Sequence, residues 1–197
     1  MHFPPKPMRA WSGSDLHAKL IADDRWICEP KVNGDRCLVI VENTVELWSR
    51  HGRRVTYSWL APLYEALKRL NLSQGTMLDA ELVAKPKPSC ELIVFDVPSL
   101  GGLSQGDKPL SERRELLMKL LRKCREPISI CPWLDKADAY ERALAEGREG
   151  IVFKKLDSKY RWQRGPTGCE VSDWIKMKPA KKPDLKLRPA VASAKSE

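Results

Sequence analysis

The chain has 197 residues, of which 42% are hydrophobic and 31% charged, enough for one large domain or two small ones with a packed core. No apolar run is long enough to span a membrane, and the start, MHFPPKPMRAWSGSD, does not read as a secretion signal. The 6 cysteines have no Cys-x-x-Cys spacing, which favours reduced thiols in the cytoplasm over disulfides or a metal site. The net charge of +9 favours a polyanionic partner, nucleic acid before an anionic membrane surface.

The first half of the chain is predicted to be rich in strands. Asn-Gly is a strong short hairpin signal because both residues tolerate positive φ, so a turn is expected at residues 33–34 with Lys31 at its rim. Strands are then expected at residues 36–41, 45–50, 76–84 and 90–97. A helix is expected at residues 60–71, because it carries leucines at helical spacing, namely Leu60, Leu63, Leu67 and Leu70.

The second half is predicted to alternate helices and strands. A helix is expected at residues 110–124, with Ser111 as its N-cap. Its buried stripe is expected to be Leu116, Leu117, Leu120 and Leu121. A strand at 127–134, a helix at 136–147 that stops at Gly147, and strands at 150–155 and 173–179 complete the prediction.

These elements predict an α+β fold with largely antiparallel sheets flanked by helices, because strands outnumber helices and come mostly in hairpin-like pairs. The composition changes at Pro179, after which the chain lacks aromatic residues and is rich in Lys, Pro and Ala. We therefore expect one domain over residues 1–179 and a flexible basic tail over residues 180–197.

Four charged stretches lie at the edges of the expected strands: KVNGDR, LDAELV, EGIVFKK and DWIKMKP. Charge beside an apolar segment is costly to bury unless a ligand or partner compensates it. These stretches supply two carboxylates and several cations: Glu81, Glu149, Lys31, Arg36, Lys154, Lys176 and Lys178. A pocket of mixed sign suits a nucleoside triphosphate with Mg²⁺, since cations meet phosphate oxygens and carboxylates hold the ion or the ribose hydroxyls.

Lys31 is a candidate nucleophile, because nearby cations, Mg²⁺ or burial favour the deprotonated amine. Its attack on phosphorus would give a covalent lysine–nucleotide adduct. Each residue also has an ordinary interpretation when taken alone: Lys31 as a solvated lysine, Glu81 and Glu149 as charges that protect a sheet edge, and Phe95 as core.

The order of the stretches resembles the covalent nucleotidyltransferases, the superfamily of ATP-dependent DNA ligases, RNA ligases and mRNA capping enzymes. KVNGDR is similar to their Lys-x-Asp-Gly-x-Arg signature. The later motifs of the superfamily are matched, in the same order, by five further stretches of this sequence: LWSRHGR, LDAELV, LIVFDV, EGIVFKK and DWIKMKP. KPMRA and PLSERRELL resemble the start of the catalytic domain and the Arg-Arg helix of many DNA ligases. The resemblance runs from about Lys6 to Pro179 and implies an ATP-grasp-like nucleotidyltransferase catalytic domain.

The resemblance also implies a site. Its nucleotide-binding residues would be Glu29, Lys31, Arg36, Arg50, Glu81, Phe95, Glu149, Lys176 and Lys178. Lys31 would be the catalytic nucleophile that takes AMP from ATP, and Glu29 would lie beside the adenine base. Glu81 would hold the ribose, and Glu81 and Glu149 would be the ligands of Mg²⁺ or Mn²⁺. DNA contacts would come from Arg36, Arg50, Lys181 and Lys182.

The chain departs from the family pattern in three ways. Asn33 replaces an Asp, which keeps the turn signal but removes a negative charge beside Lys31, and Ala80 replaces a Gly before Glu81. Most of the family continues into an OB-fold domain, for which the 18 residues after Pro179 are too few. We therefore expect either an isolated catalytic domain or a minimal enzyme whose basic tail partly replaces the barrel.

The sequence thus predicts an ATP-dependent DNA ligase that forms a lysyl-AMP intermediate and joins 3′-hydroxyl and 5′-phosphate ends at a nick in double-stranded DNA, as a monomer. Two alternatives stay open. One is an RNA ligase or capping-type nucleotidyltransferase, and the other is a basic nucleic-acid-binding module with a vestigial pocket.

Overall fold

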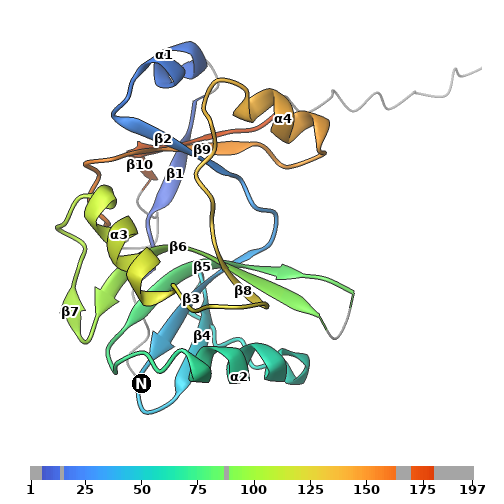
Figure 1. Ribbon diagram of the computed structural model, residues 1–197, viewed down its shortest axis with the longest axis vertical. Coiled ribbons are helices and arrows are strands. Elements are labelled where there is room, and N and C mark those ends of the chain that lie inside the picture. The colour runs from blue at the N-terminus through green and yellow to red at the C-terminus, as the bar shows by residue number, and fades with distance from the viewer. Residues whose placement is uncertain (1–5, 14–15, 87–88, 163–169, 180–197) are drawn as a thin grey trace, which may run out of the picture.

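The computed structural model describes residues 6–13, 16–86, 89–162 and 170–179. The predicted basic tail, with Lys181 and Lys182, lies outside these residues, so the domain division after Pro179 stays a prediction. Within the described residues, the chain forms two β-sheets with helices packed against them (Figure 1).

The two sheets combine strands that are distant in the sequence. The first sheet has four strands, in the order β1 (Arg9–Ser12), β10 (Glu170–Met177), β9 (Ile151–Lys155) and β2 (Trp26–Pro30). The second has six, in the order β4 (Val45–Ser49), β3 (Asp35–Val41), β5 (Met77–Ala84), β6 (Cys90–Leu100) and β7 (Leu103–Ser104), with β8 (Ile128–Ile130) paired to β6. Most neighbouring strands are antiparallel, whereas β1 with β10 and β6 with β8 are parallel. The predicted α+β fold with largely antiparallel sheets is confirmed.

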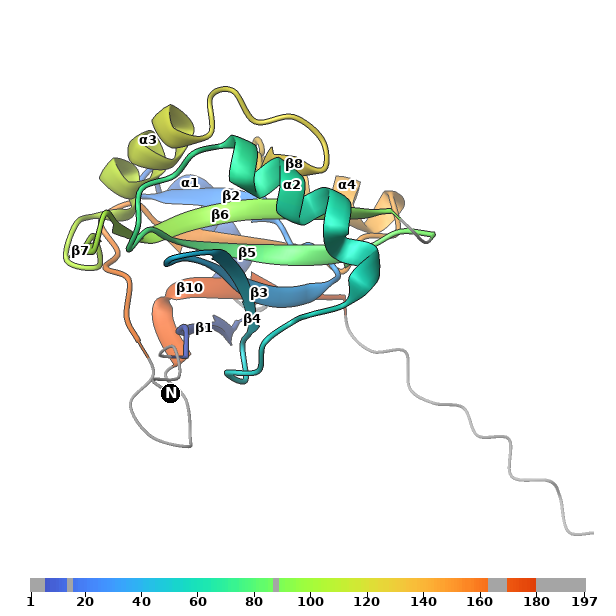
Figure 2. The same cartoon turned by 90° about the horizontal axis from the view of Figure 1, so that it is seen from below.

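The helices among the described residues are α1 (His17–Ala22), the 3-10 helix η2 (Ser58–Leu60), α2 (Ala61–Arg69), α3 (Leu110–Leu120) and α4 (Ala139–Ala145). In Figure 2, α2 and α3 lie on one face of the six-stranded sheet, and a core of buried apolar side chains joins the sheet to both helices. α1 and α4 pack on the four-stranded sheet through Leu20, Ala139 and Ala143. This arrangement leaves β1 and β10 on the opposite side of the six-stranded sheet from α2 and α3.

The predicted leucine stripe of the first long helix is confirmed. Leu60 and Leu63 are 0% exposed and Leu67 is 1% exposed. The regular α-helix is shorter than the predicted 60–71, because Leu60 belongs to η2 and the helix ends at Arg69. α4 ends just before Gly147, whose φ of 67° allows the helix to stop there as predicted.

α3 begins at Leu110 as predicted, but its N-cap is Pro109 and not Ser111. The Ser111 side chain makes no capping hydrogen bond, and its backbone N–H donates to the Leu156 carbonyl at 3.0 Å. The predicted N-cap is therefore wrong. In the predicted stripe, two leucines are buried and two are partly buried: Leu117 and Leu121, then Leu116 and Leu120.

A buried ion pair ties α3 to β6. The Arg113 guanidinium donates from Nε to Asp96 Oδ1 at 2.8 Å and from Nη2 to Asp96 Oδ2 at 2.9 Å. Its Nη1 donates to the carbonyls of Lys108 at 2.6 Å and Ser158 at 2.8 Å. Both charged side chains are 0% exposed, so Arg113 connects α3, β6 and the chain that follows β9 without contact with water.

The predicted hairpin turn at Asn33 and Gly34 is wrong. β2 and β3, which flank this pair, belong to different sheets, and neither residue has a positive φ. A Cβ on Gly34 would lie 2.5 Å from the Leu82 carbonyl oxygen, so glycine is required here by the close approach of β5. The Asn-Gly pair is a crossing point between the sheets, and Lys31 lies at the end of β2 where that crossing begins.

Four elements were absent from the prediction, namely β1, α1, β2 and β7, and each is only 2 to 6 residues long. The strand predicted at residues 127–134 is limited to β8, which has 3 residues. No helix in the described part of the chain is long and apolar enough to cross a membrane. The described cysteines, Cys28, Cys37, Cys90, Cys124 and Cys131, are free thiols.

Candidate active site

A cleft of about 740 Å³ opens between the two sheets. Its lining residues come from β1, β2, β9 and β10 on one side and from β3, β4, β5 and β6 on the other. The cleft contains all nine nucleotide-binding residues predicted from the sequence: Glu29, Lys31, Arg36, Arg50, Glu81, Phe95, Glu149, Lys176 and Lys178. The structure therefore brings the predicted set together, while the role of each member stays a prediction.

Lys31 is held in the cleft by a carboxylate from the start of β9. Its Nζ donates to Glu149 Oε2 at 2.7 Å, and its backbone N–H donates to the Gly150 carbonyl at 2.9 Å. The other oxygen of Glu149 accepts from Lys178 Nζ. Burial by itself would raise the pKa of Glu149, but the hydrogen bonds from Lys178 and Lys31 outweigh it and lower that pKa. The lysine and its partner therefore rest as an ion pair with a side chain exposure of 21% for Lys31.

The glycine after Glu149 allows this contact. Gly150 has a φ of 127°, which L side chains rarely adopt, and an added Cβ would collide with the Met177 carbonyl of β10. The Glu-Gly pair of the EGIVFKK stretch therefore lets the backbone pass close to β10 while the carboxylate turns towards Lys31.

Arg36 forms part of the opposite wall. Its Nε donates to Asp79 Oδ1 at 2.9 Å, its Nη2 to Asp79 Oδ2 at 2.5 Å, and its Nη1 to the Met8 carbonyl at 2.6 Å. The Tyr160 hydroxyl donates to the same Asp79 carboxylate at 2.6 Å. Burial alone would lower the pKa of Arg36, but the Asp79 carboxylate raises it, so the guanidinium stays charged. Arg36 is nevertheless 15% exposed, because one edge faces the cleft.

Two aromatic rings separate the cations of the two walls. The Arg36 guanidinium lies 5.4 Å from the Phe95 ring centre and 5.9 Å from that of Trp174. Lys154 Nζ lies 4.5 Å and 4.1 Å from the same two ring centres. Trp174 is 2% exposed and donates from Nε1 to Ser158 Oγ at 3.3 Å, so its ring packs within the core of the domain. Attraction to the ring faces therefore helps to stabilise both cations where they lie.

Glu29 lies at the buried end of the cleft, 2% exposed. Lys154 Nζ is 2.6 Å from its Oε2, and Arg114 Nη1 is 3.9 Å from its Oε1. Arg114 is itself fixed by donating from Nη2 to the Cys131 carbonyl at 2.6 Å and by stacking over Trp133 at 5.3 Å. Glu29 Oε1 accepts no hydrogen bond from the described residues. A buried acceptor thus remains available at the closed end of the cleft.

Glu81 is the second carboxylate of the site, opposite Arg36 in the register between β3 and β5. Burial raises the pKa of Glu81, and the positive charges of Lys31 and Arg36 lower it. Burial is the larger effect, so the pKa is about 7. A group with this pKa titrates close to neutral pH. Its charge can therefore respond to a ligand that brings a cation or removes water.

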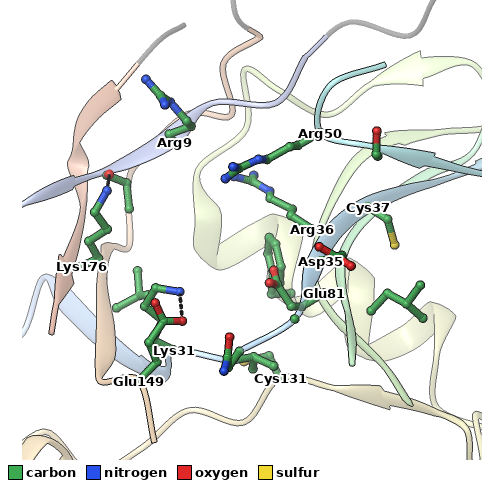
Figure 3. A pocket seen from close by; sticks show the side chains of 18 of the residues that line it. Arg9, Lys31, Asp35, Arg36, Cys37, Arg50, Glu81, Cys131, Glu149 and Lys176 are labelled. Atoms are coloured by element: carbon green, nitrogen blue, oxygen red, sulfur yellow. Dashed lines mark hydrogen bonds and ion pairs between the residues drawn. The ribbon is translucent and has the colours of Figure 1, made fainter. Parts of the chain in front are cut away.

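The outer part of the cleft is cationic on both sides. Figure 3 shows Arg36 and Arg50 reaching into the cleft from the six-stranded sheet, and Arg9 and Lys176 lying on the facing side. Arg50 donates from its backbone N–H to the Arg36 carbonyl at 3.1 Å, and Lys176 Nζ donates to the Ala10 carbonyl of β1 at 3.1 Å. These positions suit anionic groups that enter from the open side.

Sequence reasoning missed several residues that build the site. Asp79 lies in the stretch LDAELV but was assigned no role, and the contact that defines it comes from Arg36 on another strand. Lys154 was expected among the cations of the pocket, but its pairing with Glu29 was not. Arg9 and Arg114 lie in KPMRA and PLSERRELL, so the resemblance offered a signal for both. Tyr160 had no signal, since its hydroxyl reaches Asp79 from 81 positions away in the chain.

Acidic side chains in the cleft are few. In the described ranges, no group of three or more His, Cys, Asp or Glu side chains is arranged to hold a metal ion. Mg²⁺ is commonly bound through one or two carboxylates together with substrate phosphates and water. The donor set of Glu81 and Glu149 therefore fits an ion that arrives with a nucleotide better than a closed protein cage.

Comparisons with known proteins agree with this geometry. Residues 85–178 match the family model described as ATP dependent DNA ligase domain. A DNA ligase of Natronomonas pharaonis is 31% identical over 209 residues, which cover 89% of this chain and 36% of the relative. The multifunctional non-homologous end joining protein LigD of Pseudomonas aeruginosa is 31% identical over 196 residues, which cover 87% of this chain and 22% of the relative.

Solved structures share the fold. A mycobacterial DNA ligase D complexed with ATP and MES has 29% sequence identity and a TM-score of 0.70, covering 89% of this chain and 60% of that chain. An ATP-dependent DNA ligase from bacteriophage T7 in complex with ATP has a TM-score of 0.62 at 19% identity, covering 91% of this chain and 70% of that chain, which is a likeness of fold alone.

The two sheets and the cleft between them define a nucleotidyltransferase catalytic domain. The chain is similar to ATP-dependent DNA ligases in sequence and in fold. It spans 22% to 36% of the length of the two curated relatives described above.

Proposed function

We propose that the chain is the catalytic part of an ATP-dependent DNA ligase, which forms a covalent lysyl-AMP intermediate on Lys31 and then seals nicks in double-stranded DNA. The position of Lys31 carries this proposal. Its Nζ lies in the cleft 2.7 Å from Glu149 Oε2, between a buried acceptor at one end and cationic walls at the other. A nucleotide can lie along this path with its base inward and its phosphates outward.

The buried end of the cleft supports adenine over guanine. Glu29 Oε1 is an acceptor without a hydrogen-bond donor among the described residues. Adenine carries an exocyclic amine, a donor, at the position where guanine carries a carbonyl oxygen. The carboxylate would accept from adenine and repel guanine, and Lys154 and Arg114 would hold it in place.

The first chemical step is nucleotidyl transfer to the chain. The deprotonated amine of Lys31 attacks the α-phosphorus of ATP, so that an N–P bond forms while the bond to pyrophosphate breaks. Glu149 Oε2 is the nearest acceptor for the proton that leaves Lys31. Lys176 and Lys178 would bind the α-phosphate oxygens on which charge develops. When bound, Mg²⁺ or Mn²⁺ would neutralise the phosphate charge, with Glu81 and Glu149 as its carboxylate ligands.

The later steps use the cationic mouth of the cleft. AMP passes from Lys31 to the 5′-phosphate at a nick, and the adjacent 3′-hydroxyl then displaces AMP and closes the strand. Arg36 and Arg50 would bind the 5′-phosphate, since arginine suits phosphate oxygens. Action as a monomer in the reducing cytoplasm stays a prediction.

A nick-sealing assay tests this function. The protein is incubated with a 5′-phosphorylated nicked DNA duplex, a divalent cation and either ATP or GTP, and in parallel with RNA ends. Sealing of the DNA nick with ATP is the expected result. Preferred joining of RNA ends, or use of GTP, would instead indicate the RNA ligase or capping reaction. Binding of nicked DNA without any joining would indicate the non-enzymatic module.

The predicted tail contacts have a separate test. Lys181 and Lys182 would bind DNA phosphates, and lysine–phosphate contacts release counterions, so affinity should fall with salt. Deletion of residues 181–197 is expected to weaken nick binding and to flatten its dependence on salt concentration. DNA affinity measured at several salt concentrations checks this, and an unchanged slope would rule out the tail contacts.

A further inference from the structure

An exposed aromatic pair lies at the mouth of the cleft. The rings of Tyr57 and Trp59 are stacked, with centroids 5.8 Å apart and planes at 14°. Both residues line the cleft, and Tyr57 is 62% exposed. Trp59 packs against the apolar core under the six-stranded sheet. Trp59 therefore supports the inner face of the Tyr57 ring, which leaves the outer face open.

The same segment is rich in positive charge. We call residues 50–59, between β4 and α2, the cleft lip; it lies on the side of the six-stranded sheet that faces β1 and β10 (Figure 2). Arg50, Arg53 and Arg54 all line the cleft from this segment. Arg54 is fixed, because its Nη2 donates to Glu46 at 2.8 Å. Tyr57 thus lines the proposed active-site cleft together with three arginines of the same short segment.

This combination suits a single nucleic-acid strand. Aromatic side chains stack on successive bases, and neighbouring cations follow the phosphates, in proteins that bind single strands. Bases within an intact duplex are already stacked on each other, so their faces are closed to a ring. An unpaired base has an open face. The motif stretches give no role to Tyr57 or Trp59, which follow LWSRHGR without belonging to it.

We propose that the cleft lip binds an unpaired nucleobase of the DNA strand, stacked on the outer face of Tyr57, while the lip arginines bind the flanking phosphates. This rests on the proposed function, since it assumes that the cleft receives DNA. It gives the domain a means to hold frayed or single-stranded ends beside Lys31.

The test compares three probes and three proteins. The probes are a fluorescent single-stranded oligothymidylate, the same backbone with abasic residues in place of every base, and an intact duplex. The proteins are the full chain, Tyr57→Ala and the matched control Tyr57→Phe, which keeps the ring. Affinities are measured by fluorescence anisotropy at fixed salt, and the thermal midpoint of each variant is measured alongside.

The proposal predicts a loss of roughly 5- to 100-fold in affinity for oligothymidylate with Tyr57→Ala, in the range seen for removal of a stacking aromatic. The abasic strand should bind both proteins equally, within about twofold, because it offers nothing to stack. Tyr57→Phe should bind oligothymidylate like the unchanged chain. If Tyr57→Ala lowers the thermal midpoint, Tyr57→Leu, which is apolar but not aromatic, replaces it with the same expected result.

Equal losses for the oligothymidylate and abasic strands would overturn base stacking, and so would no loss for either. The latter result would leave the lip as a surface for a protein. Adenylation of the unchanged chain by ATP is assayed in the same preparation. Its absence would overturn the ligase function but not the binding result, so the two failures can be told apart.

Discussion

Two buried arginine–aspartate pairs have nearly the same local geometry and different surroundings. Arg113 with Asp96 and Arg36 with Asp79 both use Nε and Nη2 on two carboxylate oxygens, and in both the remaining Nη1 donates to backbone carbonyls. Arg113 is 0% exposed, whereas Arg36 is 15% exposed towards the cleft. The two pairs thus form the same hydrogen bonds and differ in their access to the cleft. We call Arg113 with Asp96 the closed pair and Arg36 with Asp79 the open pair, because a ligand in the cleft can reach only Arg36.

Tyr160 connects the two pairs. Its hydroxyl donates to Asp79 at 2.6 Å, and its ring lies 5.8 Å from the Arg113 guanidinium. The closed pair therefore supports the open one through a single side chain. The hydrogen bonds of the closed pair and of Tyr160 therefore hold Asp79 in place, and Asp79 in turn fixes the orientation of the Arg36 guanidinium at the cleft.

The largest expected effect comes from breaking the closed pair. Arg113→Met leaves the buried Asp96 carboxylate without its charged partner and, among the described residues, with only the Val97 N–H donating to it, at 2.8 Å, so the free energy of unfolding should fall by about 3 to 5 kcal/mol. Urea unfolding measures it. The matched control Arg122→Met, at an exposed arginine just after α3, should stay within about 0.5 kcal/mol of the unchanged chain. A loss below about 1 kcal/mol for Arg113→Met would mean that the pair does not hold the fold together.

Breaking the open pair should lower the free energy of unfolding less than breaking the closed pair, but it should impair nick sealing more. Arg36→Met is expected to lower the free energy of unfolding by about 2 to 3 kcal/mol, because Tyr160 still donates to Asp79 and water can enter from the cleft. The folded variant should lose most nick sealing, since the edge of Arg36 faces the proposed phosphate path. Sealing assayed under conditions where the variant is folded checks this. Full activity would show that Arg36 is structural, like Arg113.

Glu81, which lies beside the open pair, should make the stability of the chain depend on pH. Burial raises the pKa of Glu81, opposite Arg36, to about 7 from its ordinary 4.5, so the folded chain binds this proton more tightly than the unfolded chain. The resulting stability is fully present below pH 4.5 and is lost as the pH rises through 7. Glu81→Gln cannot ionise. Its stability relative to the unchanged chain should therefore rise between pH 5 and pH 8 by roughly 1 to 3 kcal/mol, as the pKa shift requires.

Urea unfolding of both proteins at the two pH values checks this, and a difference that does not change with pH would contradict it. The same variant should form less lysyl-AMP, because a carboxylate proposed to hold the ribose and the metal is gone. Glu149→Gln offers a contrast of opposite sign. The pKa of Glu149 is lowered by Lys178 and Lys31, so its contribution to stability is present at neutral pH and disappears as the pH falls.

Local patterns predicted the parts of the fold that depend on neighbours in the sequence. The leucines that recur at helical spacing in and just before α2 are buried, as the spacing predicted. Ordered motif stretches likewise predicted that Lys31, Glu81 and Glu149 belong to one site. These predictions were possible because each depends on residues that are close together in the chain or on the order of the motif stretches.

The rest depends on contacts that no short stretch contains. The Asn-Gly signal at residues 33–34 failed because β2 pairs with β9, more than a hundred residues away, instead of with β3. Nothing in the sequence around Asp79 distinguishes it from other strand residues, and its importance comes from its contacts with Arg36, which lines the cleft, and with Tyr160. β1 and β2 are too short to show a clear alternation of polar and apolar residues, and their partners come from the other end of the domain.

The central claim is that Lys31 becomes covalently attached to AMP, and intact mass measurement tests it most directly. The full chain is incubated with ATP and Mg²⁺ and its mass is compared with that of Lys31→Ala and of the control Lys155→Ala. Lys155 lies outside the cleft lining and pairs with Asp157 at 3.1 Å. The account predicts a gain of one AMP for the unchanged chain and for Lys155→Ala, and none for Lys31→Ala. An AMP adduct on Lys31→Ala, or no adduct on the unchanged chain, would contradict it.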